Sequence, residues 1–94
     1  MPHTVLITDP LAPEGIERLK SHPTIEFVVH DGLSEEELVE QIRSYEGLII
    51  RSGTKVKQSV ISAARNLRVI GRAGIGIDNV DVDAATKSGI VVMN

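Results

Sequence analysis

Short apolar runs alternate with helix-like segments along the whole chain. The runs cover residues 5–7, 25–29, 48–50, 67–70 and 90–93, and they are rich in valine, isoleucine and leucine. The runs are predominantly apolar instead of alternating with polar residues, which is typical of parallel strands that are buried on both faces of a sheet. The order strand–helix, repeated four times and closed by a fifth strand, predicts one doubly wound α/β domain over residues 1–94. For five strands we expect the flavodoxin-like order 2-1-3-4-5.

The four segments between the runs have helical spacing. The second has the clearest start, because Ser34 can cap it, Glu37 completes a capping box, and Leu33 can pack on Leu38. Gly47 is expected to end that helix. The residues that mark the other three helices are Pro13, Ile16 and Leu19; Val56, Val60, Ile61 and Ala64; and Asp81 or Asp83 as N-cap, Lys87 as last residue and Gly89 as C-cap.

Composition narrows the classes of function. The 94 residues carry a formal net charge of −3, which argues against a nucleic-acid partner. There is no cysteine, and the histidines and acidic residues fit no ligand spacing, so no metal site is predicted. No apolar run approaches the roughly 20 residues of a membrane span. The start of the chain does not resemble a secretory signal, so a cytoplasmic location is expected.

Two arginines follow apolar runs in the same manner. Arg51 comes directly after the third run, and Arg72 lies two residues after the fourth, between glycines 71, 74 and 76. The carboxyl ends of parallel strands share one edge of the sheet, where ligands bind. Guanidinium groups and the exposed N–H groups of a glycine-rich turn suit a small anion. The alternative is that each arginine pairs with a nearby acid, such as Asp9 or Asp78.

The glycine-rich segment also matches part of a dinucleotide-binding fingerprint. However, Asn79 occupies the position of the third glycine, and the motif follows the fourth strand instead of the first. The pattern therefore favours a turn that presents N–H groups to a carboxylate, with a tight turn without ligand as the alternative. No histidine has an acidic partner near this edge, so no catalytic acid or base is predicted.

Residues 51–56 and 71–81 resemble the D-2-hydroxyacid dehydrogenase family, and most closely its phosphoglycerate dehydrogenase branch. The similarity continues through residues 89–94, and it covers nearly the whole chain. The resemblance implies a two-domain NAD enzyme whose flavodoxin-like substrate domain begins the chain. A Rossmann domain follows it, and the returning C-terminal segment completes the substrate domain.

The resemblance also implies roles for individual residues. Arg51 and Arg72 would contact the phosphate or carboxylate of the substrate, with Ser52 and Ala73 beside them. The backbone of residues 74–76 (Gly74, Ile75 and Gly76) would face the substrate carboxylate, and Ile75 would lie near the nicotinamide of NAD.

On this interpretation the chain is the N-terminal substrate-binding part of a phosphoglycerate dehydrogenase. The parent would oxidise 3-phospho-D-glycerate to 3-phosphohydroxypyruvate in serine biosynthesis as a homo-oligomer. The part alone would be inactive, would not bind NAD tightly and would self-associate. The alternative is a freestanding flavodoxin-like module that binds an anion or a protein partner without catalysis.

Overall fold

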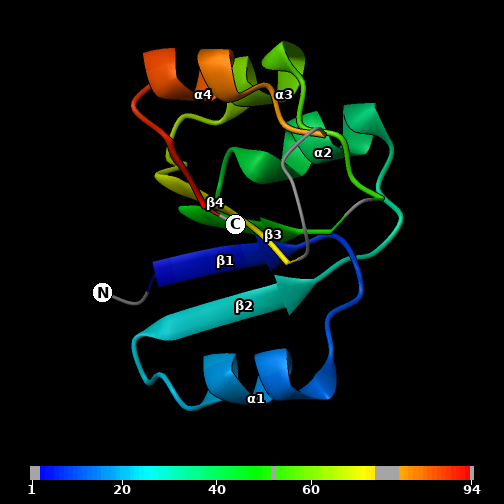
Figure 1. Ribbon diagram of the computed structural model, residues 1–94, viewed down its shortest axis with the longest axis vertical. Helices are drawn as coiled ribbons and strands as arrows, with labels where there is room; N and C mark the ends of the chain where they lie inside the picture. The colour runs from blue at the N-terminus through cyan, green and yellow to red at the C-terminus, as the bar shows by residue number, and fades with distance from the viewer. Residues whose placement is uncertain (1–2, 52, 74–78, 94) are drawn as a thin grey trace.

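The computed structural model describes residues 3–51, 53–73 and 79–93, which form a five-stranded parallel sheet with helices on both faces (Figure 1). The strand order is β2-β1-β3-β4-β5, which confirms the predicted topology. The elements in chain order are β1 His3–Ile7, α1 Pro13–Lys20, β2 Ile25–Val29, α2 Glu35–Ile42, β3 Gly47–Ile50, α3 Gln58–Ala63, β4 Val69–Arg72, α4 Val82–Lys87 and β5 Val91–Met93.

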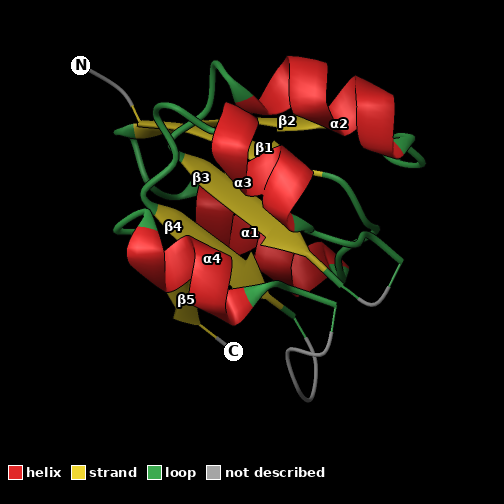
Figure 2. Ribbon diagram, turned by 90° about the horizontal axis from the view of Figure 1, so that it is seen from above, coloured by secondary structure: helices red, strands yellow, loops and turns green. Residues whose placement is uncertain are grey.

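The helices cover the two faces of the sheet unequally. Helices α2, α3 and α4 lie on one face, and α1 lies on the other, against β2 (Figures 1 and 2). The main core fills the space between the sheet and the three helices, and its fully buried members include Leu6, Ile42, Leu48, Ile50, Val60, Ile70 and Ala85. On the α1 side, Val91 and Met93 of β5 remain 58% and 56% exposed. The prediction that both faces of every strand are buried is therefore wrong for β5, and also for β2, where Val28 and Val29 are about half exposed.

Several element boundaries differ from the predicted ones. Helix α2 ends at Ile42, and Gly47 is the first residue of β3 instead of the end of the helix. Gly47 lies between Val5 and Val69 in a row across the sheet, where an added Cβ would stand 3.2 Å from Val5 Cγ2. The glycine thus permits close packing within that row. Strand β4 begins two residues later than predicted and includes Arg72.

The segment before α3 also differs. Val56 does not belong to that helix: it forms an isolated parallel bridge with Val80. This bridge joins the segment after β3 to the segment that precedes α4, and both valines are buried. Asp81 then caps α4 by accepting a hydrogen bond from the N–H of Ala84. The C-cap is Ser88, and Gly89 follows it in the left-handed region (φ +77°), which glycine adopts without steric cost.

The predicted capping box of α2 is confirmed. The hydroxyl of Ser34 accepts from the N–H of Glu37, and the N–H of Ser34 donates to Glu37 Oε1 at 3.0 Å. The N–H of Ser34 and then its hydroxyl interact with the carboxylate of Glu37 as hydrogen-bond donors, and they lower its pKa below the ordinary value of 4.5. A donor to the carboxylate favours the ionised form over the protonated form.

We expect Ser34→Ala to raise the pKa of Glu37 toward its ordinary value and to lower the stability of the domain by about 1 kcal/mol. Because the pKa is lowered in the folded state, the carboxylate stabilises the protein above its unfolded-state pKa, and this contribution disappears as the pH falls through the lowered value. NMR titration of the Glu37 carboxyl carbon in both proteins measures the shift. An identical Glu37 pKa in the two proteins would show that the hydroxyl does not act on this carboxylate.

Candidate functional site

The carboxyl ends of β1, β3 and β4 form one edge of the sheet, which we call the arginine rim after Arg51 and Arg72. Ile50 is the register partner of Arg72, and Arg51 follows Ile50 directly. The two arginines therefore lie at the ends of adjacent strands, as the sequence predicts. Strand order reverses between β1 and β3, so this edge includes the switch point at which such sheets bind ligands.

Asp9, just beyond β1, fixes the turn that follows β3. Its side chain is 8% exposed, and Oδ2 accepts from the N–H groups of Arg51 at 2.7 Å and Thr54 at 2.9 Å. The hydroxyls of Thr8 and Thr54 form a further hydrogen bond of 2.8 Å beside it. Asp9 is thus a structural carboxylate that uses the main-chain donors of this turn. A bound anion at the rim must find its donors elsewhere.

The guanidinium of Arg51 is exposed at the rim. Its Nη1 donates to the carbonyl oxygen of Pro10 at 3.4 Å, which is a long hydrogen bond. Asp9 accepts a hydrogen bond from the backbone N–H of Arg51, whereas the guanidinium donates to Pro10, so the alternative that Arg51 forms an ion pair with Asp9 is wrong. This leaves a solvated guanidinium that can turn toward a ligand with little loss of existing contacts.

Arg72 is held more firmly than Arg51. It is half-buried, and its Nε donates to Oδ1 of Asn79 at 2.8 Å. The Nδ2 of Asn79 in turn donates to the carbonyl oxygens of Arg51, at 2.7 Å, and Thr54. The side chain of Asn79 therefore connects the end of β4 to the turn after β3.

Sequence reasoning missed Asn79 as a member of this site. It considered the residue only as the missing third glycine of a dinucleotide fingerprint. The sequence feature that could have indicated this role is an amide side chain between the glycine-rich segment and the capping residue Asp81. At such a place an asparagine can bridge backbone and side-chain groups.

The other predicted site residues fall into two groups. Ala73 is exposed, and its N–H donates to the carbonyl oxygen of Ile50 at 2.8 Å, so this N–H extends the hydrogen bonding between β4 and β3. Four residues for which contacts were predicted lie outside the described residues, namely Ser52, Gly74, Ile75 and Gly76. Asp78, the possible acidic partner of Arg72, also lies outside them.

Gly53 is required by the packing of Asp9. A Cβ at position 53 would stand 2.7 Å from Oδ1 of Asp9, a distance that real Cβ atoms essentially never show. Because two hydrogen bonds hold that carboxylate, it cannot move without losing them. We expect Gly53→Ala to lower the free energy of unfolding by about 1–3 kcal/mol.

Gly15→Ala is the matched control for this substitution. Position 15 lies in α1, where the nearest atom to an added Cβ is 3.8 Å away, an ordinary contact. Alanine is the better helix former, so we expect this variant to be as stable as the unmodified protein or slightly more stable. Urea unfolding compares the two variants. Equal stability of Gly53→Ala and the unmodified protein would contradict the role given to Asp9.

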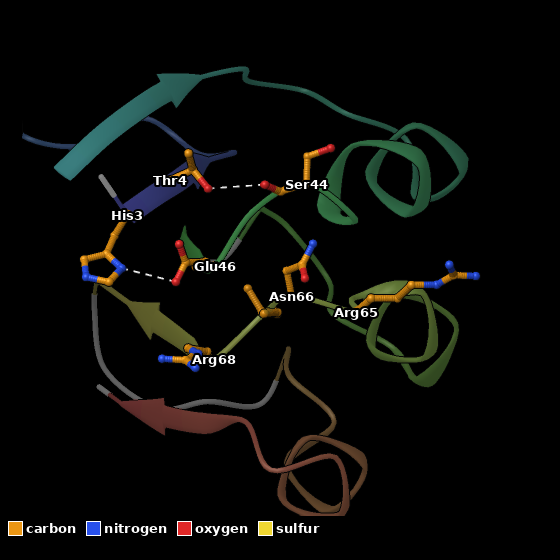
Figure 3. A pocket seen from close by; sticks show the side chains of 8 residues that line it. His3, Thr4, Ser44, Glu46, Arg65, Asn66 and Arg68 are labelled. Atoms are coloured by element: carbon orange, nitrogen blue, oxygen red, sulfur yellow. Dashed lines mark hydrogen bonds and ion pairs between the residues drawn. The ribbon is translucent and has the colours of Figure 1, made fainter. Parts of the chain in front are cut away.

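A hollow of about 600 Å³ lies at the edge of the sheet opposite the arginine rim (Figure 3). There Nδ1 of His3 contacts Oε2 of Glu46 at 3.2 Å, and Arg68 lies nearby. Figure 3 shows that the side chain of Arg65 extends away from this pair. The hollow is at the amino ends of the strands, whereas ligands of such sheets bind at the carboxyl ends. The arginine rim is therefore the better candidate for a substrate site.

The described ranges 3–51, 53–73 and 79–93 contain no group of three or more histidine or acidic side chains that could hold a metal ion. Nor does any helix within them have the length and apolar character needed to cross a membrane. The exposed guanidinium of Arg51 and the half-buried guanidinium of Arg72 can recognise an anion at the rim.

Comparison with known proteins places this geometry in a family. Residues 5–94 match the family model described as "D-isomer specific 2-hydroxyacid dehydrogenase, catalytic domain". The chain belongs to this family. Membership confirms the resemblance found at residues 51–56 and 71–81, and it accounts for a flavodoxin-like sheet with a glycine-rich rim.

Individual members of the family point to one branch. The chain is 50% identical over 90 residues to the D-3-phosphoglycerate dehydrogenase of Methanocaldococcus jannaschii and 49% identical to that of Homo sapiens; each match covers 96% of this chain. The solved structure of NAD⁺-bound 3-phosphoglycerate dehydrogenase from Entamoeba histolytica superposes on all of it with a TM-score of 0.88 and 30% identity.

The chain spans a small part of these relatives. It covers 17% of the length of the two enzymes compared by sequence and 33% of the Entamoeba histolytica structure. The fold and the family are therefore established for residues 5–94, and the activity of a complete dehydrogenase is a separate question.

Proposed function

We propose that this chain supplies the substrate-binding part of a cytoplasmic, NAD-dependent D-3-phosphoglycerate dehydrogenase. The parent enzyme oxidises 3-phospho-D-glycerate to 3-phosphohydroxypyruvate in serine biosynthesis, and it acts as a homo-oligomer. The observation that carries the proposal is the placement of Arg51 and Arg72 at the ends of adjacent strands, in a chain about half identical to enzymes of that name.

The substrate has the chemistry that this rim can recognise. 3-Phospho-D-glycerate has a phosphate at one end and a carboxylate at the other, and arginine offers a planar fork of donors to either group. On this proposal Arg51 and Arg72 hold the anionic groups, and Ser52, Ala73 and residues 74–76 have the roles that the family resemblance implies. The chain thus binds and orients the substrate.

The described residues at the switch point do not suit NAD. A dinucleotide site presents backbone N–H groups to a pyrophosphate at the first turn of the sheet. Here the turn after β1 carries the carboxylate of Asp9, which accepts the N–H groups of Arg51 and Thr54 and would repel a pyrophosphate. NAD therefore belongs to another part of the parent. Ile75, which would lie near the nicotinamide, is outside the described residues.

The partly exposed face of the sheet supports the view that more of the parent packs here. The apolar rows Val5–Gly47–Val69–Val91 and Ile49–Gly71–Met93 cross the face on which α1 packs against β2 (Figure 1). A hollow lined by Leu19, Ile49, Val69 and Met93 lies in it. In the parent, the returning C-terminal segment covers these rows.

Without that segment, we expect the 94-residue chain to self-associate through this face, because exposed contiguous apolar surface favours association. Analytical ultracentrifugation over a range of concentrations measures the effect. Met93→Lys, which places a charge on the exposed row, should shift the equilibrium toward monomer, whereas Met93→Leu should not. A monomer at high concentration with no apolar surface accessible to dye would show that the chain is complete as a domain.

The proposed function is tested with the complete gene product. We expect it to form NADH from 3-phospho-D-glycerate and NAD, and we expect the 94-residue chain alone to form none above a control without protein. A complete product that ends near residue 94, or that forms no NADH, would contradict the proposal and favour a freestanding anion-binding module. Activity of the 94-residue chain would contradict the division of roles between the two parts.

A further inference from the structure

The side-chain amide of Asn79 makes three hydrogen bonds at the rim. Its Oδ1 accepts from Nε of Arg72, and its Nδ2 donates to the carbonyl oxygens of Arg51 and Thr54. The two carbonyl partners can only accept, so they fix which end of the amide is nitrogen. The oxygen must then face Arg72. Each polar atom of the amide is matched to a partner of the opposite kind.

The backbone of Asn79 provides a firm base for this side chain. Its carbonyl oxygen accepts from the N–H of Val56 at 2.8 Å, and the N–H of Asp81 donates to the carbonyl oxygen of Val56 at 2.9 Å. The bridge between Val56 and Val80 lies between these bonds, and both valines are buried. The amide is therefore held at a fixed place relative to β3 and α3.

These contacts act on both arginines. The bond to Nε fixes the plane of the Arg72 guanidinium. The backbone of Arg51 is fixed on both sides, since Asp9 accepts from its N–H and Asn79 donates to its carbonyl oxygen. The spacing between the two arginines thus depends on Asn79.

We infer that Asn79 is a positioning residue, which holds Arg72 and the backbone of Arg51 in the arrangement that binds the anionic substrate. The inference rests on the proposed function for the identity of the anion. It also explains why this position does not carry the glycine of a dinucleotide fingerprint: a residue without a side chain could not connect the two strand ends. Asn79 acts through the arginines and does not itself bind the substrate.

NMR of the arginine Nε–Hε groups tests the contact in the 94-residue chain. In the unmodified protein, Hε of Arg72 should exchange with water more slowly than Hε of Arg43, an exposed arginine at the other edge of the sheet. Asn79→Ala should accelerate the exchange at Arg72 by about tenfold, the effect of one hydrogen bond to a charged group. Asn79→Asp retains an oxygen acceptor for Nε but turns a second acceptor toward the carbonyl oxygens of Arg51 and Thr54, so it should keep the exchange at Arg72 slow and loosen the turn after β3. The comparison of Arg72 with Arg43 in the unmodified protein tests the contact even where Asn79→Ala fails to fold.

Titration with 3-phospho-D-glycerate and with inorganic phosphate tests the consequence. Asn79→Ala should weaken binding of both by about three- to tenfold. Asn66→Ala is the matched control, because its amide donates to the carbonyl oxygen of Arg43, far from the rim, and it should leave binding unchanged.

The outcomes separate the inference from the proposed function. Equal exchange rates at Arg72 and Arg43 in the unmodified protein, or an unchanged rate at Arg72 in Asn79→Ala, would overturn the inference. The inference would also be overturned if Asn79→Ala left ligand binding unchanged while Arg72→Ala weakened it. If neither Asn79→Ala nor Arg72→Ala changes binding while the exchange at Arg72 accelerates, the contact holds and the assignment of the rim as the substrate site fails.

Discussion

Replacing Asp9 by alanine should lower the free energy of unfolding by about 2–4 kcal/mol, the largest effect on stability that we expect from a single polar side chain here. The substitution removes the acceptor of two backbone N–H groups, those of Arg51 and Thr54. Both hydrogen bonds are partly buried, and a buried donor without a partner costs about 1–3 kcal/mol. The turn after β3 would lose its anchor to β1, so Arg51 would also lose its fixed place at the rim.

Two variants serve as controls for this effect. Asp9→Asn keeps an oxygen acceptor and removes the charge, so it should retain part of the stability. Asp31→Ala removes an exposed carboxylate for which the described structure shows no hydrogen bond, and it should change stability by less than about 0.5 kcal/mol. Urea unfolding measures the free energy of unfolding of all three variants. Equal values for Asp9→Ala and Asp31→Ala would show that Asp9 does not hold the turn.

Replacing Arg72 by alanine in the complete gene product should lower kcat/KM for 3-phospho-D-glycerate by about 100-fold or more. A charge-assisted hydrogen bond between guanidinium and anion contributes several times more than a surface contact, and the loss of about 3 kcal/mol corresponds to that factor. Arg51→Ala should have an effect in the same direction. Because Arg51 is the more exposed arginine, Arg51→Ala should lower kcat/KM by less than Arg72→Ala does.

The pattern of variants distinguishes recognition from loss of folding. Arg72→Lys keeps the charge and loses the planar fork, so its activity should lie between those of the alanine variant and the unmodified enzyme. Arg43→Ala removes an exposed arginine away from the rim and should leave kcat/KM unchanged. The account would be wrong if Arg72→Ala were folded and fully active.

The sheet topology could be predicted because the apolar runs and capping residues agree with each other. The predominantly apolar runs, rich in valine and isoleucine, indicate parallel strands, and Ser34 with Glu37 indicates the start of α2. The position of Arg51 and Arg72 at one edge follows from the same topology. These features are local or follow from general rules of chain connection.

Features that depend on side chains meeting across the fold could not be predicted. Asp9 appeared as a possible partner for the guanidinium of Arg51, but it accepts the backbone N–H instead, because the turn after β3 folds over it. The shift of β4 by two residues along the chain and the bridge at Val56 arise from pairing with distant residues. The role of Asn79 depends on three partners from two strand ends, and spacing along the chain does not reveal them.

The central claim is that the arginine rim binds the phosphorylated hydroxy acid, and amide NMR of the 94-residue chain titrated with 3-phospho-D-glycerate tests it most directly. We expect weak, salt-sensitive binding, with a Kd of about 1 mM, because two arginines at a wet surface provide only modest affinity. The largest shifts among the described residues should occur at Arg51, Gly53, Arg72 and Asn79, and Arg72→Ala should abolish them. Largest shifts around His3, Glu46 and Arg68, at the opposite edge of the sheet, would contradict the claim.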